Sequence, residues 1–274
     1  MADAALDRTS PGGPRVLARR RRELIAAHVL RHGSVRVSDL TSELGVSDMT
    51  IRRDLDALTQ EGVLTKVHGG ATLAGDTPAT TLEPGFLAKS SEQTVEKQAI
   101  AAGAAALVRP GTAIGLTAGT TTWHLAARLA DVADLIVVTN SIRICETLLA
   151  HERADLTVML IGGIRTPSDA LVGPLALQAL ATLHLDQVFM GVHGMTERAG
   201  FTTPNLLEAD TNRAFVEASQ RLIVVADHSK WSTIGLASIA PLGAADTVVT
   251  DDALDRRALE TLRAHVDEVV VCAP

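Results

Sequence analysis

The chain has 274 residues, of which 46% are hydrophobic, 2% aromatic and 21% charged, and its formal net charge is −7. This length suits about two domains with aliphatic cores, and the negative charge argues against a protein that coats nucleic acid over its whole surface. No apolar run approaches the ~20 residues of a membrane span, and no export signal is indicated. The 2 cysteines lie far apart without metal-ligand spacing, so we expect a cytoplasmic protein with reduced thiols.

The charge is unevenly distributed along the chain. Residues 1–75 carry 11 Lys and Arg against 9 Asp and Glu, whereas residues 76–274 carry 14 against 23. A weakly basic head on an acidic body places a contact with nucleic acid at one end. Residues 1–17 mix Ala, Asp, Pro and Gly without periodicity and predict a disordered tail. The basic run 19–22 then enters an amphipathic helix over 22–30, either as a solvated charge run or as a phosphate contact.

The next stretch predicts two helices joined by a tight turn. Leucines four residues apart indicate a short helix over 37–44, for which Ser38 is the expected N-cap. Gly45 permits a sharp turn, and Ser47 is a good N-cap for a second helix whose apolar residues recur at helical spacing as far as residue 58. A short helix, a glycine turn and a second helix make a helix-turn-helix.

The second helix shows hydroxyl and guanidinium groups near its N-terminus, which suits a DNA major groove. Arginine can donate two hydrogen bonds to guanine, and threonine can serve a base edge or a phosphate. Alternating apolar and polar residues over 62–70, ending on paired glycines, predict a β-ribbon that acts as the wing of a winged helix over 18–73. The candidate DNA-binding residues are Arg36, Ser47, Met49, Thr50, Arg52, Arg53, Lys66 and His68.

The remainder predicts a second domain of a different class. Residues 74–93 are rich in Gly, Thr, Pro and Ser and indicate a linker. Over 94–274 we predict strands at 112–116, 135–138, 156–161, 187–190, 222–226, 247–249 and 268–271. Between and after them we predict helices at 96–108, 120–129, 174–183, 204–219 and 256–265, and one ending at 149. The fold class is therefore α/β, with an N-terminal winged helix-turn-helix followed by a mainly parallel α/β domain.

Several polar or glycine-bearing turns follow the predicted strands, where ligands of parallel sheets collect. The turn at 119–122 leads into a helix, so its outward amides suit a phosphate. After a later strand, Lys230 could neutralise a phosphate and Asp227 could hold a hydroxyl. No His spacing indicates a metal, so we predict no metal, cofactor or catalytic residue, and we interpret the loop His193 as structural. The candidate effector-binding residues are Gly119, Thr120, Thr121, Thr122, Asn140, Gly162, Gly163, Glu208, Asp227 and Lys230.

Both halves resemble one known family. Val46, Ser47 and the segments 50–55 and 68–71 closely resemble the DNA-binding domain of the DeoR family of bacterial transcriptional regulators. The second half resembles the sensor domain of that family at 119–122, 138–140, 162–163, 227–230 and 250–251. This resemblance runs from about residue 20 to the C-terminus. It implies a sensor similar in fold to ribose-5-phosphate isomerase that binds phosphorylated sugars or related metabolites.

Two positions depart from the pattern of the family. Thr117 stands where an aspartate is usual, and Asn212 stands where a lysine is usual, with Arg213 beside it. Arg213 is displaced by roughly 100° around the helix, so we do not expect it to replace the missing lysine. Both changes lower the charge that a ligand would meet, so we expect the sensor to favour a different or less charged ligand than its relatives.

These features predict a DNA-binding transcriptional regulator, a repressor of sugar or carbohydrate metabolism genes controlled by a phosphorylated sugar or related effector. Its partners would be double-stranded operator DNA and a second copy, as a homodimer or tetramer, because symmetric operators match symmetric dimers. One alternative is a sugar-phosphate isomerase-like enzyme with an appended DNA-binding domain, using Glu208 or Asp227 as base; the absence of a lysine at Asn212 weakens it. A second alternative, an architectural DNA-binding protein that ignores metabolites, is disfavoured by the turns.

Overall fold

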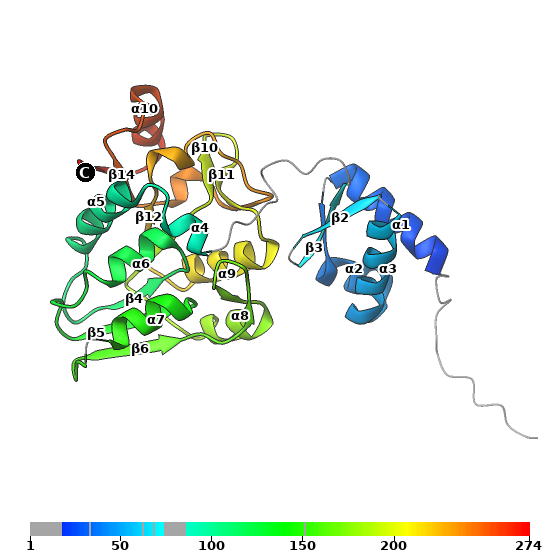
Figure 1. Cartoon of the computed structure of the whole chain (residues 1–274), viewed down its shortest axis with the longest axis horizontal. Coiled ribbons are helices and arrows are strands. Elements are labelled where there is room, and N and C mark those ends of the chain that lie inside the picture. The colour runs from blue at the N-terminus through cyan, green and yellow to red at the C-terminus, as the bar shows by residue number, and fades with distance from the viewer. Residues whose placement is uncertain (1–17, 33, 62, 68, 74–85, 151) are drawn as a thin grey trace, which may run out of the picture. The chain divides into compact units, whose positions relative to one another are not determined.

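The structure, a computed structural model, describes residues 18–32, 34–61, 63–67, 69–73, 86–150 and 152–274 (Figure 1). The chain divides into two compact units, one over Met1–Lys66 and Gly70–Asp76 and the other over Val67–Gly69 and Thr77–Pro274. The tail expected over 1–17 and the candidate His68 lie outside the described residues.

The N-terminal unit has three helices and a small sheet. The helices are α1 (Ala18–His32), α2 (Val37–Leu44) and α3 (Asp48–Gln60). The strands β1 (Ser34–Arg36), β2 (Leu64–Val67) and β3 (Gly70–Leu73) form a sheet in the order β1-β3-β2. Apolar side chains from all three helices and the sheet share one core, which includes Ile25, Leu40, Ile51, Leu55 and Leu64. The helix-turn-helix and its ribbon are therefore present, together with a strand, β1, that the sequence did not predict.

The two helix caps differ in how well the sequence predicted them. Ser47 caps α3, because its hydroxyl accepts from the amide of Thr50 at 3.4 Å. Gly45 ends α2 with φ +62°, in the left-handed region that glycine favours. The prediction that Ser38 caps α2 is wrong, since the helix begins at Val37 and its N-cap position is Arg36, two residues before Ser38. Pairing of β1 with β3 holds the chain extended up to Arg36, so the helix starts directly after this residue.

The C-terminal unit is built on a parallel sheet of seven strands in the order β15-β14-β12-β9-β4-β5-β6. These strands are β4 (Ala113–Leu116), β5 (Leu135–Thr139), β6 (Leu156–Leu160), β9 (Gln187–Gly191), β12 (Leu222–Val225), β14 (Thr247–Asp251) and β15 (Glu268–Cys272). Each one overlaps a predicted strand. These strands are short apolar runs, so their sequence signal is strong, and β4, β9, β12 and β14 are mostly buried on both faces.

Helices cover both faces of this sheet (Figure 1). The core on one face contains side chains from α5 (Thr94–Ala105), α6 (Thr120–Ala126) and α7 (Ile142–Leu149). The core on the other face contains side chains from α8 (Pro174–Leu180), α9 (Leu206–Glu217) and α10 (Arg256–His265). Neighbouring residues of one strand divide between the two cores: Val224 belongs to one and Val225 to the other. The unit is therefore a three-layer α/β/α sandwich, as the sequence predicts.

Several short elements were not predicted. They are the helix α4 (Phe86–Ser90), the hairpin of β7 (Ile164–Arg165) and β8 (Leu171–Val172), and a second sheet of β10 (Gly194–Thr196), β11 (Gly200–Thr203) and β13 (Ala237–Ala240). Single turns of 3₁₀ helix occur at η2 (His228–Lys230) and η3 (Leu242–Ala244). The helix α4 falls within the stretch 74–93 that composition predicts as a linker. Its Phe86 is buried, packing edge-on against the Trp123 ring with centroids 5.8 Å apart.

Candidate functional site

The N-terminus of α3 carries an exposed polar surface. Met49 is 64% exposed, and Arg52 and Arg53 are both exposed beside it. The hydroxyls of Ser47 and Thr50 lie 2.9 Å apart at the first turn. This side of the helix faces away from the core that Ile51 and Leu55 occupy, so its hydroxyl and guanidinium groups are available to a nucleic acid.

Acidic neighbours hold some of these basic groups in place. Arg52 pairs with Asp48 one turn earlier on α3, and this hydrogen bond raises the pKa of the guanidinium. The ammonium of Lys66 on β2 lies 2.5 Å from a carboxylate oxygen of Asp56. Arg53 has no ion pair among the described residues. Arg53 is therefore the arginine on this helix whose guanidinium is least committed to the protein itself.

One arginine of the basic run at 19–22 has a structural role. The Arg21 guanidinium lies 2.5 Å from the carboxylate of Asp54, and the two residues are 9% and 6% exposed. This buried pair joins α1 to α3. The interpretation of the run as phosphate contacts or solvated charge is wrong for Arg21, which instead fixes the orientation of α3.

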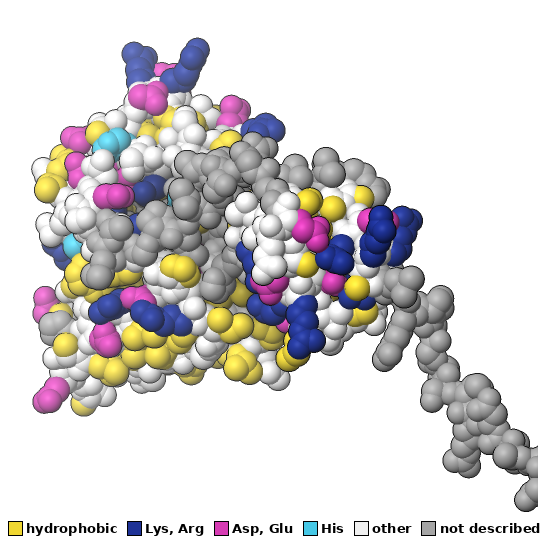
Figure 2. Space-filling view, turned by 45° about the vertical axis from the view of Figure 1, so that its right-hand side comes forward, with side chains coloured by type: hydrophobic (Ala, Val, Ile, Leu, Met, Phe, Trp, Pro, Cys, Tyr) yellow, Lys and Arg dark blue, Asp and Glu magenta, His cyan; other side chains and the backbone are white. Residues whose placement is uncertain are grey.

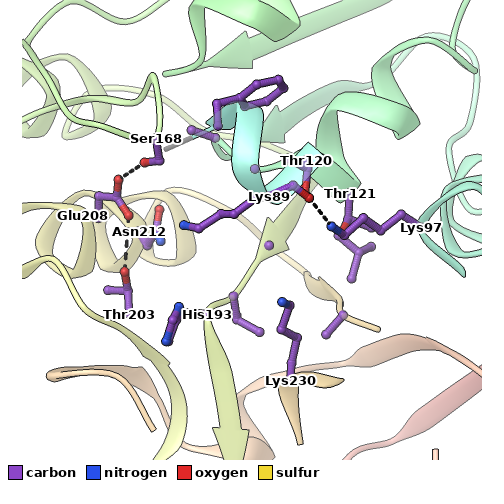
Figure 3. Close-up of a pocket in the computed structure, with 17 residues that line it drawn as sticks. Lys89, Lys97, Thr120, Thr121, Ser168, His193, Thr203, Glu208, Asn212 and Lys230 are labelled. Carbon is purple, nitrogen blue, oxygen red and sulfur yellow. Dashed lines mark hydrogen bonds between the residues drawn. The ribbon is translucent and has the colours of Figure 1, made fainter. Parts of the chain in front are cut away.

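The C-terminal unit contains a pocket at the carboxyl ends of β4, β9 and β12, in the middle of the sheet (Figure 3). Its empty volume is about 720 Å³, a figure that includes space open to solvent. The pocket is lined by Phe86, Lys89, Lys97, Ala118, Gly119, Thr120, Thr121, Ser168, Gly191, Val192, His193, Thr203, Glu208, Asn212, Val225, Ala226 and Lys230. Residues far apart in the sequence, from helix α4 to the 3₁₀ turn η2, therefore line one site.

Three lysines give one part of the pocket a positive character. In Figure 3, Lys89 extends from α4 toward Asn212, and Lys230 points into the pocket from the other side. Lys97 is only 1% exposed, and its ammonium donates to the carbonyls of Lys89 at 2.7 Å and Glu92 at 2.6 Å. Burial lowers the pKa of Lys97. Its two carbonyl partners leave Lys89 and Lys230 as the lysines best placed to meet a ligand.

Among the described residues that line the pocket, one has a carboxylate, Glu208 on α9, and hydroxyl groups surround it. One of its oxygens accepts from Thr166 at 2.8 Å and from Ser168, and the other accepts from Thr203 at 3.2 Å. Asn212 lies one turn further along α9, at the edge of the pocket. In Figure 3 the carboxylate, hydroxyl and amide groups lie on one side of the pocket, Lys230 lies on the other, and the Lys89 side chain extends between them toward Asn212. The two sides together suit a ligand with an anionic end and a hydroxylated end.

An ion cluster supports the loop that carries Ser168. Asp169 has φ +62°, and its carboxylate accepts from Arg143 of α7 at 3.1 Å and from Arg165 of β7 at 2.7 Å. Burial alone would raise the pKa of Asp169, but the two guanidiniums outweigh burial and lower that pKa. Arg143 also lies 5.6 Å above the Phe86 ring. The loop beside Glu208 and the helix α4 are therefore attached to the same arginine.

Half of the predicted effector residues line the pocket: Gly119, Thr120, Thr121, Glu208 and Lys230. The other half do not: Thr122, Asn140, Gly162, Gly163 and Asp227. Their polar atoms serve the fold instead. Thr122 donates to the Thr117 carbonyl at 2.7 Å, and Asn140 accepts from the Ala118 amide at 2.9 Å. Gly163 passes so close to the Val172 backbone that a side chain would collide with it, and Asp227 accepts from the Ser229 amide at 3.1 Å.

The two departures from the family pattern differ in position. Asn212 lines the pocket, whereas Thr117 does not and is fully buried. The Thr117 hydroxyl accepts from the Gly191 amide at 3.2 Å and so joins the ends of β4 and β9. The expectation that Thr117 replaces a ligand contact is therefore not supported by its place in the fold. Arg213 pairs with Asp210 and donates to the Ser238 carbonyl, away from the pocket lining.

Sequence reasoning missed Lys89, Lys97, His193, Ser168 and Thr203 as pocket residues. Lys89 lies in the stretch that composition predicts as a linker. Lys97 lies on a predicted helix, where the sequence pattern alone indicates a lysine exposed to solvent. Ser168 and Thr203 belong to short elements that have no periodic signal. His193 falls in a loop that the sequence analysis placed near the pocket without a ligand role. Its main-chain amide donates to Thr202 at 3.0 Å.

Comparisons with known proteins identify the family. Residues 21–77 match the DeoR-like helix-turn-helix domain, and residues 92–252 match the DeoR C terminal sensor domain. The chain belongs to the DeoR family. No helix in the described part of this DeoR-family protein is both long and apolar enough to cross a membrane.

Named relatives of this DeoR-family protein are regulators, not enzymes. An uncharacterized HTH-type transcriptional regulator, FruR, of Bacillus subtilis (strain 168) is 35% identical over 86% of this chain and 92% of its own length. The glycerol-3-phosphate regulon repressor of Escherichia coli (strain K12) is 28% identical over 89% of this chain and 95% of its own length. Among solved structures, ribose 5-phosphate isomerase A from Methanocaldococcus jannaschii matches 49% of this chain and 53% of that one, with 16% identity and a TM-score of 0.37.

Proposed function

We propose that this DeoR-family protein is a cytoplasmic repressor of sugar metabolism genes, and that a phosphorylated sugar or closely related metabolite controls its binding to a symmetric operator. The family and the regulatory role follow from the comparisons. The identity of the effector rests on one observation, the two-sided chemistry of the pocket. A phosphosugar carries an anion and several hydroxyls on one small molecule, which matches a pocket lined both by lysines and by Glu208 with its surrounding hydroxyl groups.

The phosphate would lie on the lysine side. Lys230 is held 3.9 Å from the buried carboxylate of Asp227, which fixes its side chain while leaving its ammonium donors for a ligand. Lys89 supplies a second positive charge, and Thr120 and Thr121 supply hydroxyls from the β4–α6 turn. Because Asn212 stands where a lysine is usual in the family, the pocket has one positive charge fewer, which favours a ligand of lower charge.

The hydroxyl end would lie against Glu208 and Asn212. The hydroxyl bonds that Glu208 already receives hold its carboxylate in one orientation, and the Asn212 amide can both donate and accept. A polar site of this kind rejects a ligand that lacks the matching hydroxyl, because the site would then keep an unpaired buried group. Contacts at this end of the pocket would therefore discriminate between sugars that differ in stereochemistry.

Control of DNA binding would pass through α4. This helix follows residues 74–85 in the sequence, which connect it to the DNA-binding unit, and its Lys89 side chain lines the pocket. A phosphate that pairs with Lys89 would stabilise α4 on the sensor. Coupling of this type between two sites typically amounts to about 1–3 kcal/mol.

A thermal-shift screen of phosphorylated and unphosphorylated sugars, with turnover assays on every ligand that stabilises the protein, tests this proposal. We expect stabilisation by a sugar monophosphate, none by the parent sugar, and no turnover. Lys230→Ala should lose the stabilisation, whereas Arg256→Ala, which changes an exposed residue of α10, should keep it. Equal stabilisation by phosphorylated and unphosphorylated sugars would contradict the assignment of a phosphate subsite.

A further inference from the structure

The outer edge of β6 is unusual for an exposed strand. β6 ends the seven-stranded sheet, and no strand of the described residues pairs with its outer side; it lies along the lower border of the C-terminal unit in Figure 1. Edge strands of soluble proteins are commonly protected by charges, prolines or bulges. The sequence of β6, Leu-Thr-Val-Met-Leu, has no charge and no proline, and its pairing with β5 is regular.

Apolar side chains surround this edge. Ile136 of β5 and Met159 of β6 are 44% and 42% exposed, and they lie on the sheet face that α8 and α9 cover only further along. Leu160, Ile164 and Leu175 are exposed as well, from β6, β7 and the first turn of α8. Figure 2 shows hydrophobic side chains gathered over the lower part of this unit. A cluster of this kind marks an interaction surface rather than isolated exposed residues.

The backbone of β6 is arranged for antiparallel pairing with an identical strand. The Ile161 amide donates to Thr139 at 2.8 Å, so by alternation residues 157 and 159 also bond toward β5. The amides and carbonyls of Leu156, Val158 and Leu160 consequently point outward. A twofold axis at Val158 would place Val158 opposite its own copy and Leu156 opposite Leu160, giving about six main-chain hydrogen bonds.

The side chains fit the same register. Around an axis at Val158, Met159 of each copy lies opposite Thr157 of the other. Thr157 already has Ile136 beside it in the sheet. On this face, Ile136 and Thr157 of one copy would therefore lie next to Met159 of the other. Their side chains would form one continuous row across the twofold axis. A shift by one residue would move each Met159 to the opposite face of the partner strand, so the pattern specifies one register.

The charges at the two ends of β6 also favour this arrangement. Near its start, Arg153 is surrounded by the carboxylates of Asp131, Asp134 and Asp155, which leave an excess of negative charge. Beyond its end Arg143 pairs with both Glu146 and Asp169, and Arg165 pairs with Asp169 while its own side chain stays 63% exposed. An antiparallel pair brings the acidic start of β6 in one copy toward the exposed Arg165 guanidinium of the other. A second copy of this chain is thus the occupant with matching charge.

From these observations we infer that β6 is the surface through which two copies of this protein associate, by antiparallel pairing about Val158 into one continuous sheet. The inference rests on the proposed dimer and on no other part of the proposed function. It places the interface at the edge opposite β15, which begins with a charged residue, Glu268.

Sedimentation velocity of the full-length protein across micromolar concentrations tests the surface. We expect the wild type to be dimeric and Met159→Lys to dissociate, with a dissociation constant raised on the order of 100-fold. Val271→Lys, a matched change at an exposed position of β15, should leave the dimer intact. Circular dichroism would establish that each variant is folded. A monomeric wild type, or a Met159→Lys dimer of unchanged affinity, would overturn the inference.

Cysteine crosslinking tests the register and does not depend on a disruptive variant. In the proposed pair the two Val158 Cα atoms lie about 5.5 Å apart, within the range of a disulfide, so Val158→Cys should crosslink under mild oxidation. Met159→Cys should crosslink poorly by itself but efficiently when mixed with Thr157→Cys. The wild type, with its native Cys145 and Cys272, provides the background. Absence of the Val158→Cys crosslink would refute the register, while operator binding by the same samples reports separately on the proposed function.

Discussion

The buried ammonium of Lys97 donates to the main-chain carbonyl of Lys89, 2.7 Å away, while the Lys89 side chain lines the pocket. One lysine therefore holds the backbone of α4 and another presents its charge from the same helix to a ligand. Because α4 is the first helix of the C-terminal unit, the pocket and the start of this unit share a physical connection. That connection is the basis for the coupling we propose between effector and DNA.

Removal of the Lys97 ammonium should loosen α4. In Lys97→Met the carbonyls of Lys89 and Glu92 lose their donor, while the buried stem keeps a similar volume. We expect faster amide hydrogen exchange over 86–92 and a weaker effect of effector on operator affinity, with operator affinity itself unchanged. Unchanged exchange over 86–92 would mean that Lys97 does not hold α4.

Arg53 and Lys66 should contribute to DNA binding in different ways. Arg53 is exposed on α3 without an ion pair among the described residues, so Arg53→Ala should cost about 1–3 kcal/mol with the operator and relax its specificity at one base pair. Lys66 lies on β2. Lys66→Ala should weaken binding to all DNA sequences alike and reduce the slope of log affinity against log salt concentration by about one. Fluorescence anisotropy with operator and scrambled duplexes over a salt series separates the two. Identical losses on both duplexes for Arg53→Ala would contradict base readout.

The Arg21–Asp54 pair should be important for stability. Asp54→Ala leaves a buried guanidinium without its partner, which typically costs about 3–5 kcal/mol. Asp48→Ala removes the partner of the exposed Arg52 and should cost less than about 1 kcal/mol. Urea denaturation of the two variants measures the difference. Equal losses would show that the Arg21–Asp54 pair is no more important than an exposed one.

The sequence predicts the sheet better than the site. The seven main strands are short apolar runs, so local composition is enough to find them. The pocket depends on which polar groups the backbone itself uses. Thr122 and Asn140 look like ligand residues in the sequence, yet both satisfy main-chain groups of neighbouring segments. Lys89 reaches the pocket only because Phe86 anchors α4 against Trp123, a tertiary contact with no local signal.

His124 should make the fold sensitive to acid. Its Nε2 is buried without a hydrogen bond among the described residues, and burial, with help from Lys97 and Arg128, lowers its pKa from the ordinary 6.5. The unfolded chain therefore takes up this proton more readily than the folded one, so stability should fall as the pH drops below about 6.5. His124→Gln should flatten this part of the curve of unfolding free energy against pH. An unchanged slope between pH 6.5 and the lowered pKa would contradict the assignment to His124.

A ligand in this pocket should change operator binding through Lys89. The decisive measurement is operator affinity, by fluorescence anisotropy, with and without the sugar phosphate that stabilises the wild type, for wild type, Lys89→Ala and the surface control Arg256→Ala. We predict that the ligand changes operator affinity about 5–150-fold in the wild type and in Arg256→Ala, and has little effect in Lys89→Ala, which binds the operator normally without ligand. A Lys89→Ala protein that responds as the wild type does, or a wild type that ignores the ligand, would contradict the account.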